Sequence, residues 1–330
     1  MRMSLHTRAM KLVIPGGTGQ VGTILARAFH GGGHEVVVLS RRPSPAPWRT
    51  VAWDGRTVGH WATELDGADA VINLAGRSVN CRYGRENKRA ILESRLESTR
   101  AVGTAIGRAR RPPRVWLQAS TATIYAHRFD VPNDEATGLV GGTESDAPAT
   151  WRFSIEVAQA WERALEEMSV PHTRKVALRS AMVMSPDPGG IFDTLLALVR
   201  RGLGGTAASG RQYISWIHDA DFIRSVAWLL THDEVSGPVN VAASHPLPNA
   251  LFMRMLRDAW GVPLGLPATA WMLEIGAFLM RTETELVLKS RRVVPGRLLE
   301  AGFVFEFPEW SVAAHDLCHR WRTTRRNRNS

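Results

Sequence analysis

The stretch that most constrains the fold of this chain is KLVIPGGTGQVG, residues 11–22, in which an apolar run leads directly into four glycines. At this spacing the first glycine permits a tight turn, the middle one lets the backbone approach a pyrophosphate, and the last allows a helix to pack closely on a strand. Residues 21–29 have the apolar pattern of that helix, whose first N–H groups would hold the phosphate. The stretch predicts a dinucleotide-binding turn, with an ordinary glycine-rich loop as the alternative.

The next apolar run indicates which dinucleotide would bind. Residues 34–39, HEVVVL, are typical of a buried parallel strand, and Ser40, Arg41 and Arg42 follow at its end. Enzymes that prefer NAD usually carry Asp or Glu here for the ribose 2′-hydroxyl, whereas an Arg accommodates the 2′-phosphate of NADP. The sequence therefore favours NADP; the alternative is that the two arginines only solvate a strand end.

Strand and helix patterns alternate along the rest of the amino-terminal half. Residues 49–53, 70–76, 114–120 and 173–183 have strand-like patterns. Residues 86–108 and 151–168, which lie between them, have helix-like patterns. This alternation predicts an α/β fold with a Rossmann-like, doubly wound parallel sheet, because right-handed crossovers bring successive strand ends to one edge. With 330 residues, 44% of them hydrophobic, the chain can bury a large core.

The net charge of +10 is concentrated at the carboxyl terminus, where the segment HRWRTTRRNRNS carries five arginines. No helix-turn-helix, zinc or RNA-binding motif accompanies these arginines, so we expect no specific nucleic-acid partner. Nonspecific contact between this segment and polyanions is the alternative.

The sequence also bears on compartment. No apolar run is long enough to span a bilayer, and residues 1–10 are typical of a short disordered extension, since they lack the apolar core of a signal peptide. Cys81 and Cys318 provide neither a disulfide framework nor metal-ligand spacing. We therefore expect a cytoplasmic protein with no membrane partner and no metal, and the sequence indicates no oligomeric state.

Further segments resemble one family: INLAG (72–76), ESRLEST (93–99), ASTATIYA (119–126) and GRQYISWIHDADF (210–222). With the glycine turn they resemble extended short-chain dehydrogenases/reductases, and RRVVPGRLLEAGFVFEFP (291–308) resembles the epimerase-family proteins that carry a carboxy-terminal domain of unknown function. The resemblance implies an arrangement of domains along the chain. It consists of an NADP-binding Rossmann domain over 11–184 to which 211–235 returns, a small mixed substrate domain over 185–210 and 236–317, and a basic tail over 318–330.

The resemblance also implies a set of cofactor-binding residues. They belong to the glycine turn, to the strand ends that follow it, and to a helix position where many relatives have Asn and this chain has Arg. The set is Gly16, Gly17, Thr18, Gly19, Gln20, Val21, Gly22, Ser40, Arg41, Leu74, Ala75, Gly76, Arg95, Ser120 and Val183. For Arg95, a solvated position on the helix is the alternative.

One departure from the family concerns catalysis. Short-chain reductases use a Tyr as general acid or base, with a Lys four residues later that lowers the pKa of the phenol. None of the three tyrosines of this chain has a Lys at that distance, and the expected helix positions hold Phe153 and Val157. Neither side chain can transfer a proton, so the usual Tyr-Lys pair is missing.

Other residues are candidates for the missing chemistry. Thr121, at a predicted strand end, would hold a substrate oxygen, or else would bond the local backbone. Tyr125 would face the nicotinamide and supply the proton, with a buried structural tyrosine as the alternative, and His127 is a further candidate. Arg82 and Tyr83, in the loop after residues 72–76, would meet a polar or anionic substrate or else lie on the surface.

For the segment SWIHDAD we favour structural roles. His218 titrates in a useful range, but in extended reductases the equivalent stretch mainly joins two domains. Asp221 is expected to order the helix that begins there.

These residues predict an NADP-dependent oxidoreductase or epimerase that acts on an unknown small molecule. The alternative is a protein of another class, a sensor or regulator that binds NADP and turns nothing over. The missing Tyr-Lys pair favours the second hypothesis, whereas the retained Thr121 favours the first.

Overall fold

The computed structural model describes residues 8–144, 148–269, 272 and 285–329. Its centre is a seven-stranded sheet with the strand order β10-β6-β5-β4-β1-β2-β3, in which every neighbouring pair runs parallel. The strands are β1 (Lys11–Pro15), β2 (Glu35–Ser40), β3 (Arg49–Ala52), β4 (Ala70–Asn73), β5 (Val115–Thr121), β6 (Arg174–Ser180) and β10 (Gly237–Val241). Because the order reverses between β1 and β4, the sheet is doubly wound, and the predicted Rossmann-like fold is confirmed.

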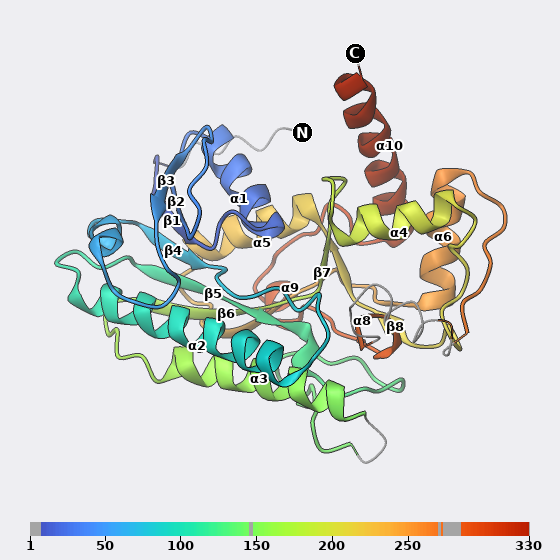
Figure 1. Cartoon of the computed structure of the whole chain (residues 1–330), viewed down its shortest axis with the longest axis horizontal. Coiled ribbons are helices and arrows are strands. Elements are labelled where there is room, and N and C mark those ends of the chain that lie inside the picture. Colours follow the sequence, from blue (N-terminus) through green and yellow to red (C-terminus); the bar gives the residue numbers. More distant parts are fainter. Residues whose placement is uncertain (1–7, 145–147, 270–271, 273–284, 330) are drawn as a thin grey trace.

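Helices cover both faces of the sheet (Figure 1). Helices α1 (Gln20–Gly31) and α5 (Asp219–Thr231) lie on one face, and α2 (Arg85–Arg108) and α3 (Ala149–Glu166) lie on the other. Two short 3-10 helices, η1 (His60–Leu65) and η2 (Ala122–Ile124), follow β3 and β5.

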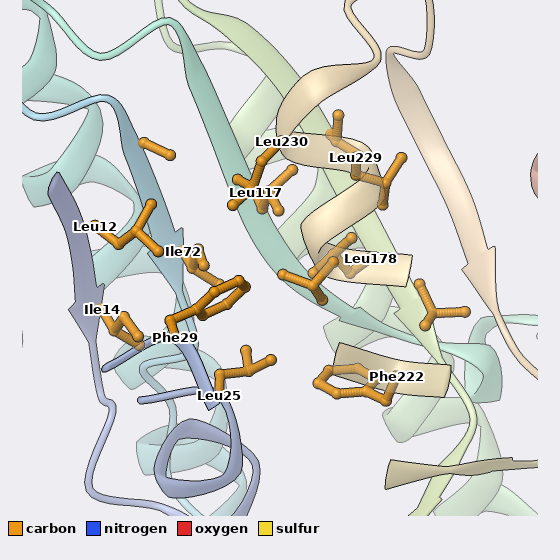
Figure 2. Close-up of a cluster of buried hydrophobic side chains, with 14 of the residues drawn as sticks. Leu12, Ile14, Leu25, Phe29, Ile72, Leu117, Leu178, Phe222, Leu229 and Leu230 are labelled. Atoms are coloured by element: carbon orange, nitrogen blue, oxygen red, sulfur yellow. The ribbon is translucent and has the colours of Figure 1, made fainter. Parts of the chain in front are cut away.

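The side chains of β1 show why two layers form. Successive residues of a strand point to opposite faces, so Leu12 and Ile14 join the core under α1 and α5, whereas Val13 joins the core under α2. Figure 2 shows the first core, where Phe29 of α1 and Phe222 of α5 meet the strand side chains. Apolar residues on both sides of each strand are what a buried parallel sheet requires.

The carboxy-terminal part has a separate core. The run 173–183 contains β6 and then β7 (Met182–Met184), which leaves the large sheet and pairs with β9 (Trp216–His218). Beyond β7, large aromatic and aliphatic side chains from α4, α6 and α10 pack on one another, with the ring of Trp310 stacked 4.0 Å from that of Phe252. The elements of this part are α4 (Ile191–Arg200), β8 (Tyr213–Ile214), β11 (Leu247–Pro248), α6 (Asn249–Trp260), α8 (Glu285–Leu288), α9 (Gly296–Glu300) and α10 (Trp310–Asn329).

The segment expected as a basic tail is helical in the structure, since α10 continues to Asn329. Cys318 and Trp321 are buried, and the guanidinium of Arg320 donates to both carboxylate oxygens of Asp219 at 2.8 and 2.7 Å. The first turns of the segment are therefore part of the packed core, and only the later turns project from the body (Figure 1). At the other end of the described chain, Met10 is already buried in the core under α1.

The described residues contain neither a membrane-spanning helix nor a cluster of metal ligands. Among those residues, no helix combines the length and the apolar character needed to cross a bilayer. Nor do the described residues contain a group of three His, Cys, Asp or Glu side chains placed to hold a metal ion.

Candidate functional site

The glycine turn joins β1 to α1, and its glycines serve different purposes. Gly16 has φ +75°, and a Cβ there would lie 2.7 Å from the Cα of Ala75, so both the backbone and the neighbouring strand end require glycine. A Cβ on Gly22 would lie 2.5 Å from the Cα of Gly17, which is the close helix-to-strand packing that the motif predicts.

Gly19 differs from these two glycines. Its φ is −71°, and the nearest atom to a Cβ built on it is the carbonyl oxygen of Gly16 at 3.7 Å. The protein's own packing therefore leaves space above Gly19, and that space belongs to a cavity of about 690 Å³. Gly19 is also the N-cap of α1 and has no side chain to accept from the first N–H groups of the helix. Such N–H groups bind anions readily.

This first cavity collects most of the predicted cofactor residues. Gly16, Thr18 and Gly19 line it from the turn, Ser40 and Arg41 from the end of β2, and residues 74–76 from the end of β4. The hydroxyls of Thr18 and Ser40 lie 3.3 Å apart. The sheet thus brings the ends of three strands to one opening, as the crossovers predicted.

The charges at the β2 end of the first cavity are mostly positive. Arg41 and Arg42 line the cavity and are exposed, and Arg56, from the loop after β3, lines it as well. Asp54 also lines the cavity, but its carboxylate accepts from Thr57 and from the N–H of Arg56. Although partial burial opposes ionisation, these hydrogen bonds hold the pKa of Asp54 below its usual range. Sequence reasoning missed Arg56, because it considered only the residues directly after the second strand.

A second cavity of about 260 Å³ lies at the carboxyl end of β5, between α2 and α3. Four predicted residues line it: Tyr83, Arg95, Ser120 and Thr121. Phe153 and Val157 line it too, so the two side chains that stand where the family carries Tyr and Lys lie in the wall of this cavity. On the side of α3 the wall is therefore apolar except for the hydroxyl of Ser154.

Arg95 lies between the two cavities. Its Nη1 donates to the carbonyl oxygens of Arg77, which lines the first cavity, and of Ile91, at 3.0 and 2.9 Å. Its side chain passes beside Gly76, where a Cβ would lie 3.3 Å from the Cγ of Arg95. Burial lowers the pKa of Arg95 to about 10, which still leaves it cationic at neutral pH. The alternative of a freely solvated helix residue does not match this placement.

The local alternative offered for Thr121 is confirmed, and its side chain also reaches the second cavity. Its hydroxyl oxygen accepts from the N–H of Thr123 at 3.1 Å and so caps η2, while its side chain lines the second cavity. A hydroxyl that accepts one hydrogen bond still has its O–H to donate. Next to it, Ser120 donates to the Glu162 carboxylate at 2.6 Å, and Arg179 donates twice to the same carboxylate.

Tyr125 lies outside both cavities, which contradicts the expectation that it faces the nicotinamide. It follows η2, its ring is buried with Ile124 and Val293, and its hydroxyl donates to Asn240 and accepts from Arg179, both at 2.9 Å. Burial raises the pKa of Tyr125, although the charge of Arg179 opposes the shift. A phenol held in this way matches the alternative of a buried structural tyrosine.

The two histidine candidates also make structural contacts. Nδ1 of His127 accepts from the N–H of Ser290 at 2.8 Å. His218 is the N-cap of α5, where its Nδ1 accepts from the N–H of Ala220 at 3.1 Å. Asp221, expected to order this helix, lies in its first turn and accepts from Arg224 of the same helix at 2.6 Å. It also accepts from the N–H groups of residues 306 and 307, and so holds the segment before α10.

The remaining predicted cofactor residues lie behind the cavities. Gly17 and Gly22 pack on each other, and Gln20 packs on Gly190. Val21 is partly buried against the core, and Val183 lies within β7. These side chains shape the site without lining it.

Sequence reasoning missed the far wall of the second cavity. Glu285 of α8 lines it and is buried, and its Oε2 accepts from the hydroxyl of Ser154 at 2.5 Å. Beyond it the buried Lys289 donates to the carbonyl of Thr123 at 2.8 Å, and burial lowers the pKa of Lys289 to about 8. No local pattern around residues 285–289 pointed to a site, because these residues reach the cavity only through the tertiary fold. The family's Gly-Glu pair, replaced here by Met280-Arg281, lies outside the described residues.

Comparisons with known proteins support this description. A model of the NAD dependent epimerase/dehydratase family matches residues 12–242, and a model of a domain of unknown function (DUF1731) matches residues 268–317. The chain is 32% identical over 313 residues to the epimerase family protein SDR39U1 of Bos taurus, covering 93% of this chain and 99% of that protein.

Two solved structures are also similar. The crystal structure of human epimerase family protein SDR39U1 with NADPH has a TM-score of 0.82 at 29% identity, covering 94% of this chain and 99% of that one. A nucleoside-diphosphate sugar epimerase from Corynebacterium glutamicum has a TM-score of 0.73 at 26% identity, covering 94% of this chain and 59% of that one. With its doubly wound sheet, its glycine turn and these matches, the chain belongs to the NAD dependent epimerase/dehydratase family.

Proposed function

We propose that this protein binds NADP(H) and uses it to move a hydride to or from a carbon of a small-molecule alcohol or carbonyl compound, as an oxidoreductase or epimerase. The observation that carries the proposal is the first cavity. Its floor at Gly19 is open, its helix end is uncapped, and three arginines stand where a 2′-phosphate would lie. The human relative crystallised with NADPH supports the choice of cofactor.

The residues present fit such a dinucleotide. The N–H groups at the start of α1 and the space above Gly19 would take the pyrophosphate. Arg41, Arg42 and Arg56 would hold the 2′-phosphate, since Arg binds phosphate through charge-assisted hydrogen bonds. The second cavity would receive the nicotinamide and the substrate, and the nicotinamide supplies or accepts the hydride when it is bound.

The protein's own contribution in the second cavity is to orient the substrate. The free O–H of Thr121 would donate to a substrate oxygen, and the apolar side chains of Phe153 and Val157 would exclude water from the reacting carbon. At about 260 Å³ the cavity suits a small molecule.

The competing proposal is a sensor that binds NADP(H) without turnover. It is favoured by one observation, the apolar Phe153 and Val157 in the wall where the family carries Tyr and Lys. A sensor also needs a partner that distinguishes the oxidised from the reduced cofactor.

Calorimetry on nucleotide-free protein tests the shared part of both proposals. We expect NADPH to bind more tightly than NADH, and no heat with either nucleotide would refute both. Turnover then separates them: NADPH absorbance is followed across a panel of aldehydes, ketones and sugar nucleotides. An enzyme oxidises bound NADPH with at least one compound and loses this activity in Thr121→Val while keeping its affinity for NADPH. An epimerase restores its cofactor in each turnover, so the sugar nucleotides are also checked by NMR for inversion of a carbon. A sensor shows neither oxidation of NADPH nor inversion with the whole panel.

A further inference from the structure

The second cavity needs a proton donor that is neither Phe153 nor Tyr125. Among the described residues that line it, Tyr83 and Glu285 carry a phenol and a carboxylate, which are side chains that act as general acids and bases, whereas Arg95 remains a cation. Tyr83 belongs to the loop between β4 and α2, and Glu285 belongs to α8. The side chains of Tyr83 and Glu285 both contact α3 near its amino-terminal end.

Tyr83 approaches the place where the family's tyrosine would stand. Its ring packs edge-on against the ring of Phe153, with the centroids 5.2 Å apart. Its hydroxyl lies 3.4 Å from the hydroxyl of Ser154, the residue directly after Phe153. A phenol from a different loop thus comes beside the position that the family's helix tyrosine would occupy.

Ser154 connects Tyr83 to a buried carboxylate. The Ser154 hydroxyl has two acceptors within reach, Oε2 of Glu285 at 2.5 Å and the oxygen of Tyr83 at 3.4 Å. Its single proton serves one of them at a time, and while that proton is on the shorter bond to Glu285 a lone pair of Ser154 faces Tyr83. Glu285 is itself almost fully buried, and Lys289 lies 3.9 Å from its other oxygen. The three side chains form a row, phenol to hydroxyl to carboxylate, that leads from the cavity into the interior.

The charges around Tyr83 replace the missing lysine. The guanidinium groups of Arg95, from α2, and of Arg291, from the segment after α8, both interact electrostatically with Tyr83. Lys88, also from α2, lies 5.1 Å from the centre of the Phe153 ring. The one acid in this row, Glu285, accepts from Ser154 through one carboxylate oxygen, and Lys289 lies 3.9 Å from the other. Neighbouring positive charges favour a phenolate, which is what the family's lysine does for its tyrosine.

We propose that Tyr83 is the catalytic acid and base of the second cavity, and that Ser154 and Glu285 are positioning residues that pass its proton on. This inference rests on the proposed function. In alcohol oxidation the substrate O–H bond breaks and its proton goes to the oxygen of Tyr83, while Tyr83 gives its own proton to Ser154 and Ser154 gives its proton to the Glu285 carboxylate. The substrate carbon loses its hydride to the oxidised nicotinamide dinucleotide. In carbonyl reduction each transfer runs in reverse, from a protonated Glu285 to the substrate oxygen.

The test uses the nucleotide-free protein, because the chain has only three tyrosines, Tyr83, Tyr125 and Tyr213. Labelling tyrosine with ¹³C at Cζ gives three NMR signals, which single Tyr→Phe variants assign. On raising the pH we expect Tyr83 to ionise first and the buried Tyr125 last. We also expect the Tyr83 signal to shift at lower pH as Glu285 ionises, a shift that disappears in Glu285→Gln and weakens in Ser154→Ala.

Two results would overturn the inference. One is a Tyr83 that ionises no earlier than Tyr213, and the other is a Tyr83 signal that is the same in Glu285→Gln as in the unchanged protein. Neither measurement needs a cofactor, so failure of the proposed function, seen as no heat with NADPH, is distinguishable from failure of this inference. Calorimetry on Tyr83→Phe should show NADPH affinity within about twofold of the unchanged protein, since a difference of that size corresponds to less than about 0.5 kcal/mol.

The carbonyl panel adds a second readout. Where the unchanged protein oxidises NADPH, Tyr83→Phe should lower the rate about 10²- to 10⁴-fold, and the matched Tyr213→Phe should leave it unchanged. An equal rate in Tyr83→Phe excludes Tyr83 as the acid and base. Where the unchanged protein is inactive with the whole panel, the NMR titration alone decides. The melting temperature of each variant checks that it is folded.

Discussion

The two cavities are built in different ways. The first is lined mostly by residues at the ends of β1, β2, β3 and β4 and in the loops that follow them, with Ser94 and Glu97 from α2, so its whole lining comes from residues 16–97. The second is assembled from side chains of α2, β5, α3 and α8, and the hydrogen bond from Ser154 to Glu285 spans 131 residues. A site made by consecutive strand ends is dictated by local sequence, whereas a site made by distant side chains depends on the whole fold.

The largest effect is expected where buried charges support the second cavity. Arg179 and Glu162 form an ion pair at 2.7 Å with side chains only 10% and 9% exposed, and Glu162 also holds Ser120 in the cavity wall. Although burial opposes the charged form, the hydrogen bonds and charge of Glu162 raise the pKa of Arg179. Arg179→Met leaves the carboxylate buried without its cation, so we expect a loss of about 3–5 kcal/mol in the free energy of unfolding, measured by urea denaturation.

The matched control for this prediction is a surface pair. Arg27 lies 2.5 Å from Asp187, with side chains 55% and 26% exposed, so Arg27→Met should cost only about 0–1 kcal/mol. Equal losses in the free energy of unfolding for Arg179→Met and Arg27→Met would mean that the buried ion pair beside the second cavity contributes no more to stability than the surface pair.

A pair of glycine variants probes the first cavity. In Gly22→Ala the new methyl meets the Cα of Gly17 at 2.5 Å, so we expect a loss of about 1–3 kcal/mol in stability. In Gly19→Ala the nearest atom is 3.7 Å away, so stability should change by less than about 0.5 kcal/mol. The second methyl enters the cavity, and we expect NADPH affinity to fall by about tenfold in calorimetry. Full NADPH affinity in a folded Gly19→Ala protein would show that the cofactor does not bind over Gly19 in the first cavity.

These glycines also show how much of the molecule was predictable. The turn, the parallel sheet and the part of the first cavity formed by the turn and by the ends of β2 and β4 follow from short-range rules: strand, glycine spacing, helix, and the residues at the next strand end. The structure places Gly16, Thr18, Gly19, Ser40 and Arg41 in one cavity as those rules predict. Local patterns suffice here because the carboxyl ends of parallel strands must share an edge.

The second cavity was only partly predictable, and Tyr125 shows why. Its spacing from Thr121 suggested a shared cavity, but η2 intervenes and Arg179, 54 residues away, holds the phenol in the interior. The side chains that do line the cavity include Glu285, whose surroundings along the chain carry no motif. Partners brought together over long sequence separations are set by packing, which single-sequence patterns do not encode.

A charge variant tests whether the arginines of the first cavity select NADP. Arg41 lines the cavity and would bind the 2′-phosphate by a charge-assisted hydrogen bond worth roughly 1.5–3 kcal/mol. Arg41→Ala should therefore weaken NADPH binding about ten- to hundredfold in calorimetry and leave NADH binding unchanged. Arg49→Ala is the control, because Arg49 pairs with Glu64 at 2.6 Å and does not line the cavity. If Arg41→Ala weakens the binding of NADPH and of NADH equally, Arg41 does not recognise the 2′-phosphate and instead stabilises the fold or binds the pyrophosphate.

We expect the smallest effect from the side-chain network around His218, which lines neither the first nor the second cavity. His218 is fully buried, its Nε2 lies 2.9 Å from Asp316 of α10, and burial lowers its pKa even though Asp219 and Asp316 oppose the shift. Because the folded pKa lies below the unfolded value of about 6.5, the unfolded chain binds the proton first and stability falls as the pH drops below about 6.5. One such group contributes a slope of at most about 1.4 kcal/mol per pH unit.

Urea midpoints between pH 7.5 and 5.5 measure this slope. We expect it to become shallower in His218→Gln and to stay the same in His172→Gln, because His172 is exposed. The ion pair of Arg320, whose side chain is 38% exposed, with the buried Asp219 fastens α10 beside His218. If His218→Gln keeps the full slope, the acid sensitivity lies in carboxylates elsewhere and not in the buried side-chain network at the α10 junction.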